Sequence, residues 1–233
     1  MRRRCGLTLL ILSTLIGVAT VWAYKPGPDI VRECPGCDTL IQQQTMMSGN
    51  TLGARIWTDG KMDASMLPDR PWLVKCPNCD TLFWIDEARK LGEQNRNLEN
   101  RSWPGAIDPD LPTEADFLSL LAAGELSEEK ELYLRRRAWW AANDVIRADE
   151  AAVDSLLPAQ EANLQAFATL LDEKNPDQWI TKAEICRELK RFDDCIALLA
   201  QPFEGAHYSE VAAFIKELAE EKSWKVREIT ADK

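Results

Sequence analysis

Two stretches of the sequence, CPGCDTLI at residues 34–41 and CPNCDTLF at residues 76–83, are almost the same eight-residue phrase. Each opens with a cysteine pair of the form Cys-Pro-x-Cys and continues through Asp-Thr-Leu into a large apolar residue. Two turns of one design can hold a metal ion between them, form disulfides, or act as redox-active dithiols. Most of what the sequence says about function depends on which of these three is correct.

The spacing of the four cysteines is C-x2-C, then 38 intervening residues, then C-x2-C. This pattern resembles a zinc ribbon, in which two such turns approach one ion from opposite sides. Four thiolates arranged as a tetrahedron close the coordination sphere of Zn²⁺ and leave no position for water. Asp38 and Asp80 stand where ribbons often have glycine, which leaves the geometry of the turns open. We expect one structural Zn²⁺ with four ligands, Cys34, Cys37, Cys76 and Cys79.

Disulfides and dithiol redox chemistry are the alternatives that the sequence leaves open for these four cysteines. An exported protein meets an oxidising compartment, in which structural disulfides form and persist. Thioredoxin-like chemistry requires its cysteine pair at the start of a helix within a βαβ unit. Both pairs here precede β-favouring residues instead. The sequence therefore favours zinc first, structural disulfides second and redox activity third.

The first 23 residues have the composition of a targeting segment. Arg2, Arg3 and Arg4 precede an apolar run over residues 7–23 that ends in Val-Trp-Ala. Such a segment is typical of a secretory signal peptide, and an uncleaved signal-anchor is the close alternative because the run just reaches membrane-spanning length. Both interpretations place the remaining chain outside the cytoplasm, either exported to the periplasm or anchored to the inner membrane. A misassigned start codon, with a domain beginning near residue 29, would remove the leader.

Beyond the leader, the sequence predicts an α+β, mainly helical chain in which a small β-rich module precedes an all-α domain. Strands are expected at residues 54–57, 72–74 and 82–85. The dipeptide Asp59-Gly60 favours the positive φ angles of a type I′ hairpin, which would fill the long gap between the cysteine pairs. Residues 86–102 are polar and predict a helix followed by a linker.

The second half is rich in alanine, leucine and glutamate at helical spacing. Thr113, with Asp116 three residues later, is typical of a helix N-terminus. Helices are expected over residues 114–123, 127–148, 159–173, 177–189, 193–200 and 208–221. The predicted organisation is a leader at 1–23, a zinc-ribbon module at 28–88, a helix and linker at 89–112, and a helical domain at 113–228.

One stretch of the helical half, residues 176–202, resembles a tetratricopeptide repeat. Its matching positions are Trp179, the small residue Ala183, the turn Arg191-Phe192-Asp193-Asp194, Cys195 and Leu199. In that repeat two helices cross closely, so small residues are required at the crossing and each unit buries its face by stacking on a neighbour. Lys190 replaces the usual turn glycine. An irregular all-α bundle is the alternative, and in both cases Cys186 and Cys195 would be packing residues, although a disulfide between them is possible after export.

A wider resemblance covers the first module. The segments SGNTLGARIWTDGK and MLPDRPWLVKCPNCDTLFW, at residues 48–61 and 66–84, are similar to a group of uncharacterised bacterial proteins. Those proteins join an N-terminal CxxC…CxxC ribbon to a tetratricopeptide-like helical region. The resemblance implies an architecture and no known reaction.

Charge argues against nucleic acid as the partner. The formal net charge of the chain is -10, and no long basic run exists outside the first four residues. Residues 24–88 contain six lysines and arginines and nine acids, so the predicted ribbon carries about three negative charges. Phosphate backbones are repelled by such a surface.

The sequence offers little for catalysis and somewhat more for binding. His207 is the only histidine, which excludes a histidine-rich metal site, and no nucleotide-binding or serine-hydrolase motif is present, so no catalytic residue is expected. Arginines at 135–137 beside Trp139 and Trp140 could form a recognition surface. The simpler interpretation is that both tryptophans are core residues and the arginines pair with Glu128, Glu129 and Glu131.

We therefore expect a non-catalytic scaffold with a structural zinc ribbon and a helical domain that binds a protein partner. The membrane would be contacted only through an uncleaved leader. An envelope thiol–disulfide protein is the second hypothesis, and a hydrolase with an unseen carboxylate site is the third.

Overall fold

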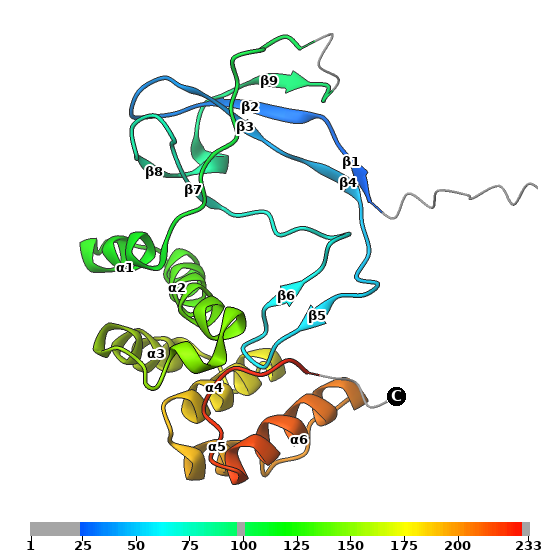
Figure 1. The fold of residues 1–233 in the computed structure, drawn as a ribbon, viewed down its shortest axis with the longest axis vertical. Coiled ribbons are helices and arrows are strands. Elements are labelled where there is room, and N and C mark those ends of the chain that lie inside the picture. The colour runs from blue at the N-terminus through cyan, green and yellow to red at the C-terminus, as the bar shows by residue number, and fades with distance from the viewer. Residues whose placement is uncertain (1–23, 97–100, 230–233) are drawn as a thin grey trace, which may run out of the picture.

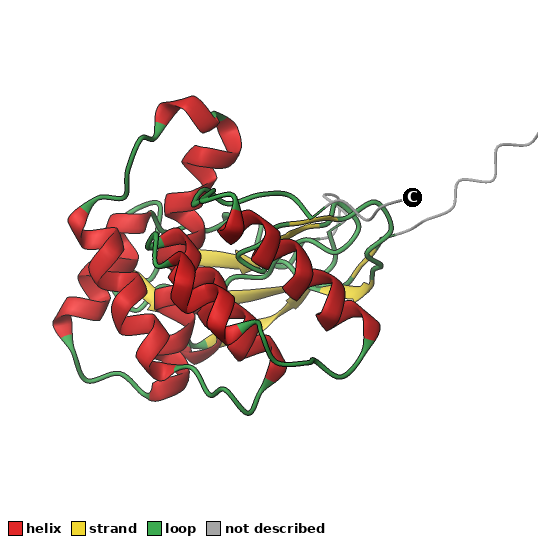
Figure 2. Cartoon of the chain, turned by 90° about the horizontal axis from the view of Figure 1, so that it is seen from below, coloured by secondary structure: helices red, strands yellow, loops and turns green. Residues whose placement is uncertain are grey.

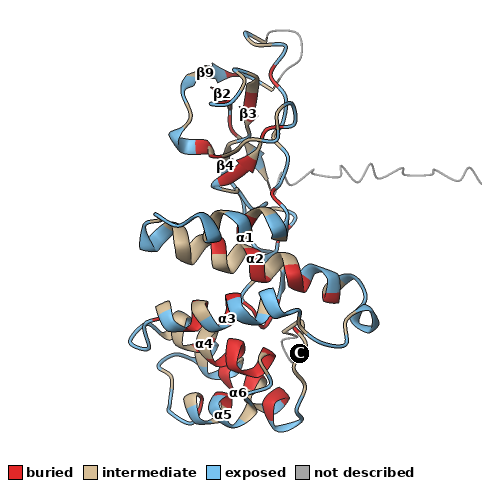
Figure 3. Ribbon diagram, turned by 90° about the vertical axis from the view of Figure 1, so that its left-hand side faces the viewer, coloured by how far each residue is buried: buried red, intermediate tan, exposed pale blue. Residues whose placement is uncertain are grey.

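The computed structural model describes residues 24–96 and 101–229, and the leader expected at residues 1–23 lies outside these ranges. The chain is of mixed α and β structure and mainly helical, with six α-helices and several small antiparallel sheets in the described part. The β-rich part and the lower helices lie at opposite ends, with α1 and α2 between them (Figures 1 and 3). The expected α+β, mainly helical class is thus confirmed. Within residues 24–96 and 101–229, no helix combines the length and apolarity needed to cross a bilayer.

Four short antiparallel sheets make up the β-rich part and its insert. β2 lies at the centre of the three-stranded sheet β3-β2-β9, and the other strands pair as β1–β4, β5–β6 and β7–β8. The strands are β1 (Lys25–Pro26), β2 (Asp29–Glu33), β3 (Leu40–Gln43), β4 (Met46–Ser48), β5 (Arg55–Ile56), β6 (Met62–Asp63), β7 (Leu73–Lys75), β8 (Leu82–Trp84) and β9 (Lys90–Gln94). Strand β3 follows the first cysteine pair, and β8 follows the second, as the two copies of the phrase predict.

The helical part begins where the sequence predicts it to begin. Thr113 and Asp116 form a reciprocal capping box at the start of α1, with Asp116 N donating to Thr113 Oγ1 at 3.2 Å. Asn175 caps α4, whose first residue is Pro176. The helices are α1 (Glu114–Ala123), α2 (Glu128–Ala148), α3 (Pro158–Leu170), α4 (Pro176–Glu188), α5 (Phe192–Leu198) and α6 (Ala206–Glu220). All six predicted helices are confirmed, with ends that differ by at most three residues.

The expected helix within residues 86–102 is wrong. A single 3-10 turn, η1 (Ile85–Glu87), is followed by β9, which pairs antiparallel with β2. Gly92 sits in the middle of this strand, and a Cβ there would overlap the indole of Trp103. Trp103 in turn donates its backbone N–H to the side chain of Gln94 at 3.1 Å. The strand forms because tertiary pairing with β2 and packing on Trp103 outweigh the helical preference of its polar residues.

The hairpin at Asp59-Gly60 exists, but its turn is not of type I′. Gly60 has φ of 77°, whereas Asp59 is not among the residues with positive φ, and a type I′ turn needs both. Trp57 accepts from Gly60 N at 2.8 Å and donates its own N–H to Lys61 O at 2.9 Å. This is a type I turn followed by a glycine bulge. Asp59 adopts this conformation because its carboxylate accepts the N–H of Lys61 and faces the helical part.

This hairpin does not fill the space between the cysteine pairs but extends onto the helices (Figure 1). Trp57 packs with Ile146 of α2 and with Val226 near the C-terminus. The C-terminal segment also pairs with the hairpin, since Thr58 N donates to Arg227 O at 2.8 Å and Ile229 N donates to Ile56 O at 2.7 Å. The insert between the cysteine pairs is therefore a strap that joins the β-rich part to the helices.

The buried side chains form separate clusters rather than one core. One cluster surrounds the cysteines, one joins α1 and α2 to Leu73, one joins α2 to α3 and α4, and one joins α4, α5 and α6. The helices turn their buried residues toward one another and present exposed faces outward (Figure 3). Seen from below, the helices lie in front of the strands (Figure 2). Both parts thus have their own buried interior, and the strap contributes a further contact between them.

Candidate metal centre

The four cysteines predicted as ligands converge on one point. Their Sγ atoms all lie within 4.8 Å of one another. Sγ of Cys34 is 3.7 Å from Sγ of Cys79, and Sγ of Cys37 is 3.7 Å from Sγ of Cys76. A tetrahedron with metal–sulfur bonds of 2.3 Å has sulfur–sulfur edges of about 3.8 Å. The four sulfur atoms could therefore hold one tetrahedral metal ion.

The two copies of the phrase fold into two matching turns. In the first, Cys34 N donates to Thr39 O at 2.9 Å and Asp38 N donates to Cys34 O at 3.1 Å. In the second turn, Cys76 N donates to Thr81 O at 2.9 Å, and Asp80 N donates to Cys76 O at 2.9 Å. The repeated sequence therefore encodes one backbone conformation twice, and each copy supplies two sulfur atoms.

Asp38 and Asp80, which stand where zinc ribbons often have glycine, adopt the backbone conformation of glycine at these positions. Both have φ of 59°, in the left-handed region that glycine occupies most readily. Aspartate tolerates this conformation better than most residues because its short polar side chain can bond to local groups. Both turns thus form with aspartate in the left-handed conformation that glycine adopts most readily.

The one internal difference between the two turns has a structural reason. Gly36 in the first turn corresponds to Asn78 in the second. A Cβ on Gly36 would overlap the side-chain hydroxyl of Thr81, which belongs to the opposite turn. The side chain of Asn78 instead reaches across, with its Nδ2 3.6 Å from Sγ of Cys37. The residue at this position of each turn therefore contacts the opposite turn, which explains why the two positions differ.

Polar groups of both turns contact the sulfur atoms: Gly36 N donates to Sγ of Cys34 at 3.4 Å, and Asn78 Nδ2 donates to Sγ of Cys37 from the opposite turn. The hydroxyls of Thr39 and Thr81 lie 3.0 and 3.1 Å from Sγ of Cys37 and Cys79 respectively. The bonds to Thr39 lower the pKa of Cys37 to about 6, whereas burial raises the pKa of Cys34 to about 12. Donors around the thiolates are what a metal site needs, because they spread the negative charge of the ligands.

The geometry agrees less well with disulfides. A disulfide requires sulfur atoms about 2.05 Å apart, whereas Sγ of Cys34 and Cys79, and of Cys37 and Cys76, are 3.7 Å apart, and each of these pairs joins one turn to the other. All six cysteines of the described ranges are free thiols, including Cys186 and Cys195. These last two are buried in the cluster between α4, α5 and α6, where they act as small apolar side chains.

The linker before α1 holds the two halves of the cysteine site together. Ile107 donates its N–H to Leu40 O at 3.0 Å and accepts from Gln42 N at 2.7 Å, along the edge of β3. Three residues later, Asp110 exchanges two backbone hydrogen bonds with Lys75 at the edge of β7, at 2.9 and 3.0 Å. Both strands adjoin a cysteine pair, so this linker fixes the separation of the two turns.

The strap carries a buried polar network that sequence reasoning missed. Asp59, at its tip, is 3% exposed and forms an ion pair with Arg147 of α2. Asn143 donates Nδ2 to Asp59 Oδ2 at 2.9 Å and to Glu188 Oε1 of α4 at 3.0 Å. Glu188 also accepts from Trp139 Nε1 at 2.7 Å. Burial raises the pKa of Asp59 and raises the pKa of Glu188 well above its ordinary value.

A second buried pair extends this network toward the C-terminus. Glu184 and Arg187 of α4 are both 0% exposed and form an ion pair. Arg187 also donates to Thr58 Oγ1 of the strap at 3.2 Å and to Lys225 O at 3.0 Å. Six charged or amide residues therefore meet here from segments far apart in the sequence, which is why no local pattern pointed to them. The single sequence signal was an unusual density of polar residues on the apolar face of α4.

The segment with three arginines and two tryptophans is largely structural. Trp139 is 2% exposed, and the partly buried Trp140 donates Nε1 to the backbone carbonyl of Asp59 at 3.0 Å. Arg135 pairs with Glu131 at 2.6 Å, as expected, whereas Arg137 pairs with Asp69 of the strap rather than with a neighbouring helical acid. Trp139 is therefore a core residue, as expected, whereas Trp140 is only partly buried, and two of the three arginines have ion-pair partners.

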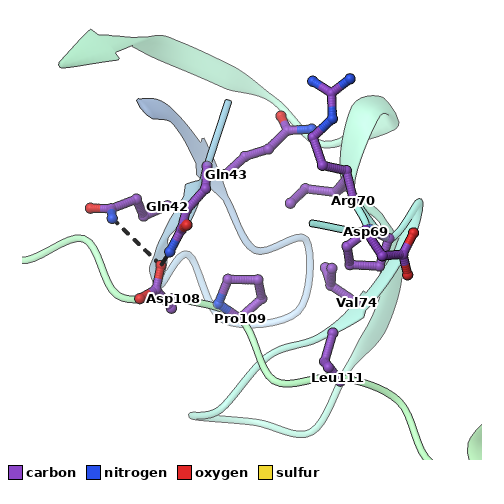
Figure 4. A pocket seen from close by; sticks show the side chains of 11 residues that line it. Gln42, Gln43, Asp69, Arg70, Val74, Asp108, Pro109 and Leu111 are labelled. Carbon is purple, nitrogen blue, oxygen red and sulfur yellow. Dashed lines mark hydrogen bonds between the residues drawn. The ribbon is translucent and has the colours of Figure 1, made fainter. Parts of the chain in front are cut away.

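A shallow hollow of about 260 Å³ lies beside the cysteine site (Figure 4). Its floor includes Val74 and Pro109, and glutamines from the end of β3 line one side. Asp108 Oδ1 accepts from the side chains of Gln42 at 3.5 Å and Gln44 at 3.2 Å, and Gln43 donates to Asp86 Oδ1 at 3.0 Å. This hollow adds no donor set for a metal.

Comparison of the chain with protein-family models, with curated proteins and with solved structures finds no match, so the candidate metal centre rests on its own geometry.

Proposed function

We propose that this protein is a non-catalytic scaffold with one structural Zn²⁺ in a ribbon, bound by Cys34, Cys37, Cys76 and Cys79. The observation that carries the proposal is the convergence of four sulfur atoms, from two matching turns, within 4.8 Å of one another. Sulfur-only tetrahedral donor sets favour Zn²⁺ among the metals that are common in proteins. A site closed by four thiolates leaves no coordination position at which the metal could activate water, so its role is structural.

We assign the binding role to the helical part, which we propose to be tetratricopeptide-like over residues 176–202. Ala183 and Cys195 are buried where α4 meets α5, as close helix crossing requires. Lys190, in place of the turn glycine, has φ of 61°, and Arg191 N donates to Cys186 O at 2.8 Å. Helix α6 ends in the same way, with Lys222 at φ of 57° and Ser223 N donating to Leu218 O at 2.9 Å. Both helix ends are Schellman caps, which many helices share, so the support for a repeated unit is the close crossing at Ala183 and Cys195, and helical repeats generally bind proteins.

The negative charge of the chain and of the ribbon favours a protein partner over nucleic acid. The leader at residues 1–23 supports an exported or inner-membrane-anchored location, with membrane contact only through that leader. A thiol–disulfide protein of the same compartment is the alternative. It predicts a measurable dithiol potential and no bound metal.

The proposal is tested by comparing Cys76→Ser with Cys186→Ser in the full chain. We expect Cys76→Ser to lose zinc and the ordered ribbon while keeping most of its helical circular dichroism, because α4, α5 and α6 have their own buried cluster. Cys186→Ser is the matched control, a buried thiol outside the tetrad, and it should retain one zinc per chain. Stoichiometric zinc in Cys76→Ser, or a zinc-free wild type with a reversible dithiol couple, would reject the scaffold proposal in favour of the alternative.

A further inference from the structure

A cleft of about 400 Å³ lies where the strap meets the helices. Its walls come from the strap, α2, α4 and the start of α6, with Ile229 at one edge. The apolar part of the lining includes Trp140, Ile180 and Val211. Because four segments of the chain converge on it, the shape of this cleft depends on the docking of the strap.

Arg136 lines this cleft and lacks a partner. It makes no hydrogen bond and no ion pair with any residue of the described ranges, unlike its neighbours Arg135 and Arg137. Its guanidinium carbon lies 6.0 Å from the centroid of the Phe167 ring. Burial lowers the pKa of Arg136, and the nearby carboxylate of Asp177 offsets only part of this effect. A half-buried cation of this kind is stabilised by an anion that arrives from solution.

Helix α6 adds further positive character to the same cleft. Its N-cap, Gly205, provides no side-chain cap, and its first turn contains no acid. His207 and Tyr208, both in that first turn, line the cleft. Backbone N–H groups at an uncapped helix start favour negative charge.

The acids around the cleft limit the charge of the ligand. Asp59 is already paired with Arg147. Asp177 accepts from the Tyr208 hydroxyl at 3.3 Å and remains the one acid that opposes an incoming anion from close by among the residues lining the cleft. One unpaired arginine facing one acid suits a monoanion better than a doubly charged phosphate, because the second charge would be repelled by Asp177. Carboxylate matches the planar fork of arginine in a bidentate manner.

We propose that this cleft binds a monocarboxylate attached to an apolar or aromatic group, with Arg136 as the carboxylate-binding residue. The carboxylate would belong either to a small organic acid or to the C-terminus of a peptide. The apolar group would pack against Trp140, Ile180 and Val211. By contrast, in the hollow of Figure 4 Gln42 and Gln44 are hydrogen-bonded to Asp108, and the arginine that lines it, Arg70, is exposed rather than half-buried. The proposal is independent of the metal, and failure of either one leaves the other standing.

Ligand binding to this cleft can be followed through the NMR signals of His207, which lines it. His207 is the only histidine, so its imidazole gives one set of NMR signals, from the lining of the cleft. We would titrate the zinc-loaded full chain with N-acetyl-phenylalanine and with its uncharged amide. The acid should shift the His207 signals saturably, and the amide should leave them unchanged at the same concentrations. Equal shifts with both compounds, or none with the acid at millimolar concentration, would overturn the proposal.

Variants of Arg136 and its neighbour make the test specific. Arg136→Gln should weaken binding of the acid by about tenfold or more, since a charge-assisted hydrogen bond is lost. Asp177→Asn should strengthen binding, because the opposing acid is removed while the hydrogen bond to Tyr208 can be kept. Arg70→Gln is the control, an exposed arginine outside this cleft whose loss changes the net charge equally. Unchanged binding in Arg136→Gln, or weaker binding in Asp177→Asn, would contradict the assignment.

Two further probes separate the sources of the carboxylate. Phenylacetate represents a small organic acid, and N-acetyl-Ala-Ala-Phe represents a peptide C-terminus. Tighter binding of one identifies the source, and binding of either with the same dependence on Arg136 supports the site. Inorganic phosphate that binds as tightly as both would contradict a site built for a monocarboxylate.

Discussion

The side-chain amide of Asn143 in α2 donates to the carboxylate of Asp59 at the tip of the strap, with 2.9 Å between Nδ2 and Oδ2. Asp59 lies between the two cysteine pairs in the sequence, yet its side chain is completely buried against the helices. The segment that separates the two cysteine pairs is thus also a segment that contacts the helical part. Asp59 is therefore expected to be one of the residues through which the β-rich part and the helices stabilise each other.

Asp59→Asn should destabilise the whole chain. The substitution leaves the buried guanidinium of Arg147 without its most buried partner, and breaking a buried pair in this way costs about 3–5 kcal/mol. Arg147 also pairs with the more exposed Asp144 at 2.7 Å, so we expect a loss of about 3 kcal/mol in the free energy of unfolding. Urea denaturation of the zinc-loaded chain measures it. Asp154→Asn, an exposed acid with no ion pair among the described residues, should change stability by less than about 0.5 kcal/mol.

A second attachment between ribbon and helices passes through Tyr133 of α2. Its hydroxyl accepts from Trp72 N at 3.0 Å, and its ring stacks on Trp72 with centroids 5.1 Å apart. Tyr133→Phe keeps the stacking and should lose about 1 kcal/mol of unfolding free energy with the hydrogen bond. Tyr133→Leu removes both interactions and should lose a further amount of about 0.5–1.5 kcal/mol. Equal unfolding midpoints for the two variants would show that the stacked pair contributes nothing.

The raised pKa of buried Glu188 should make the free energy of unfolding depend on pH. Burial raises its folded-state pKa well above the ordinary value of 4.5, so the folded chain holds a proton that the unfolded chain releases. The contribution of Glu188 to stability is therefore fully present below about pH 4.5 and is lost progressively as the pH rises toward the folded-state value. Glu188→Gln removes this titration. Between pH 5 and 8 the unfolding free energy of the wild type should fall relative to that of Glu188→Gln, and parallel pH profiles would contradict the assignment.

Gly36 and Asn78 form a matched pair for testing how the two turns fit together. Gly36→Ala places a methyl group against the hydroxyl of Thr81, and such overpacking costs about 1–3 kcal/mol. If the whole cost falls on the zinc-bound form, the affinity for zinc should drop by about five- to 150-fold. Asn78→Ala, at the equivalent position of the other turn, loses a single weak contact to sulfur and should change the affinity only slightly. Competition with a chromogenic chelator measures both, and similar affinities for the two variants would refute the fit.

The sequence was most informative where the chemistry is local. The four cysteines could be recognised as one site because each turn is a self-contained phrase, and the helices could be placed from their apolar periodicity and, for α1, from Thr113 at its start. Strand β9 could not be predicted, since its polar residues and Gly92 form a strand only through pairing with β2 and contact with Trp103. In this segment the pairing of β9 with β2 outweighs the helical preference of its polar residues.

The polar network at the strap lies beyond local reasoning for a different reason. Asp59 looked like an ordinary turn residue, and nothing near it in the sequence indicates that Arg147 and Asn143, more than 80 residues later, would enclose it. Arg136 could not be distinguished from Arg135 and Arg137 either, because all three are neighbours on one helix. Only the positions of Glu131 and Asp69 show which two are paired.

The most direct test of the central claim is the metal content and thiol count of the chain isolated from the compartment in which it resides. Native mass spectrometry with thiol labelling, before and after addition of a chelator, provides both. We predict one zinc per chain and four thiols that become reactive only when the zinc is removed. A chain without zinc, in which Cys34, Cys37, Cys76 and Cys79 are all oxidised, would contradict the structural zinc ribbon and favour a disulfide or redox role for the repeated phrase.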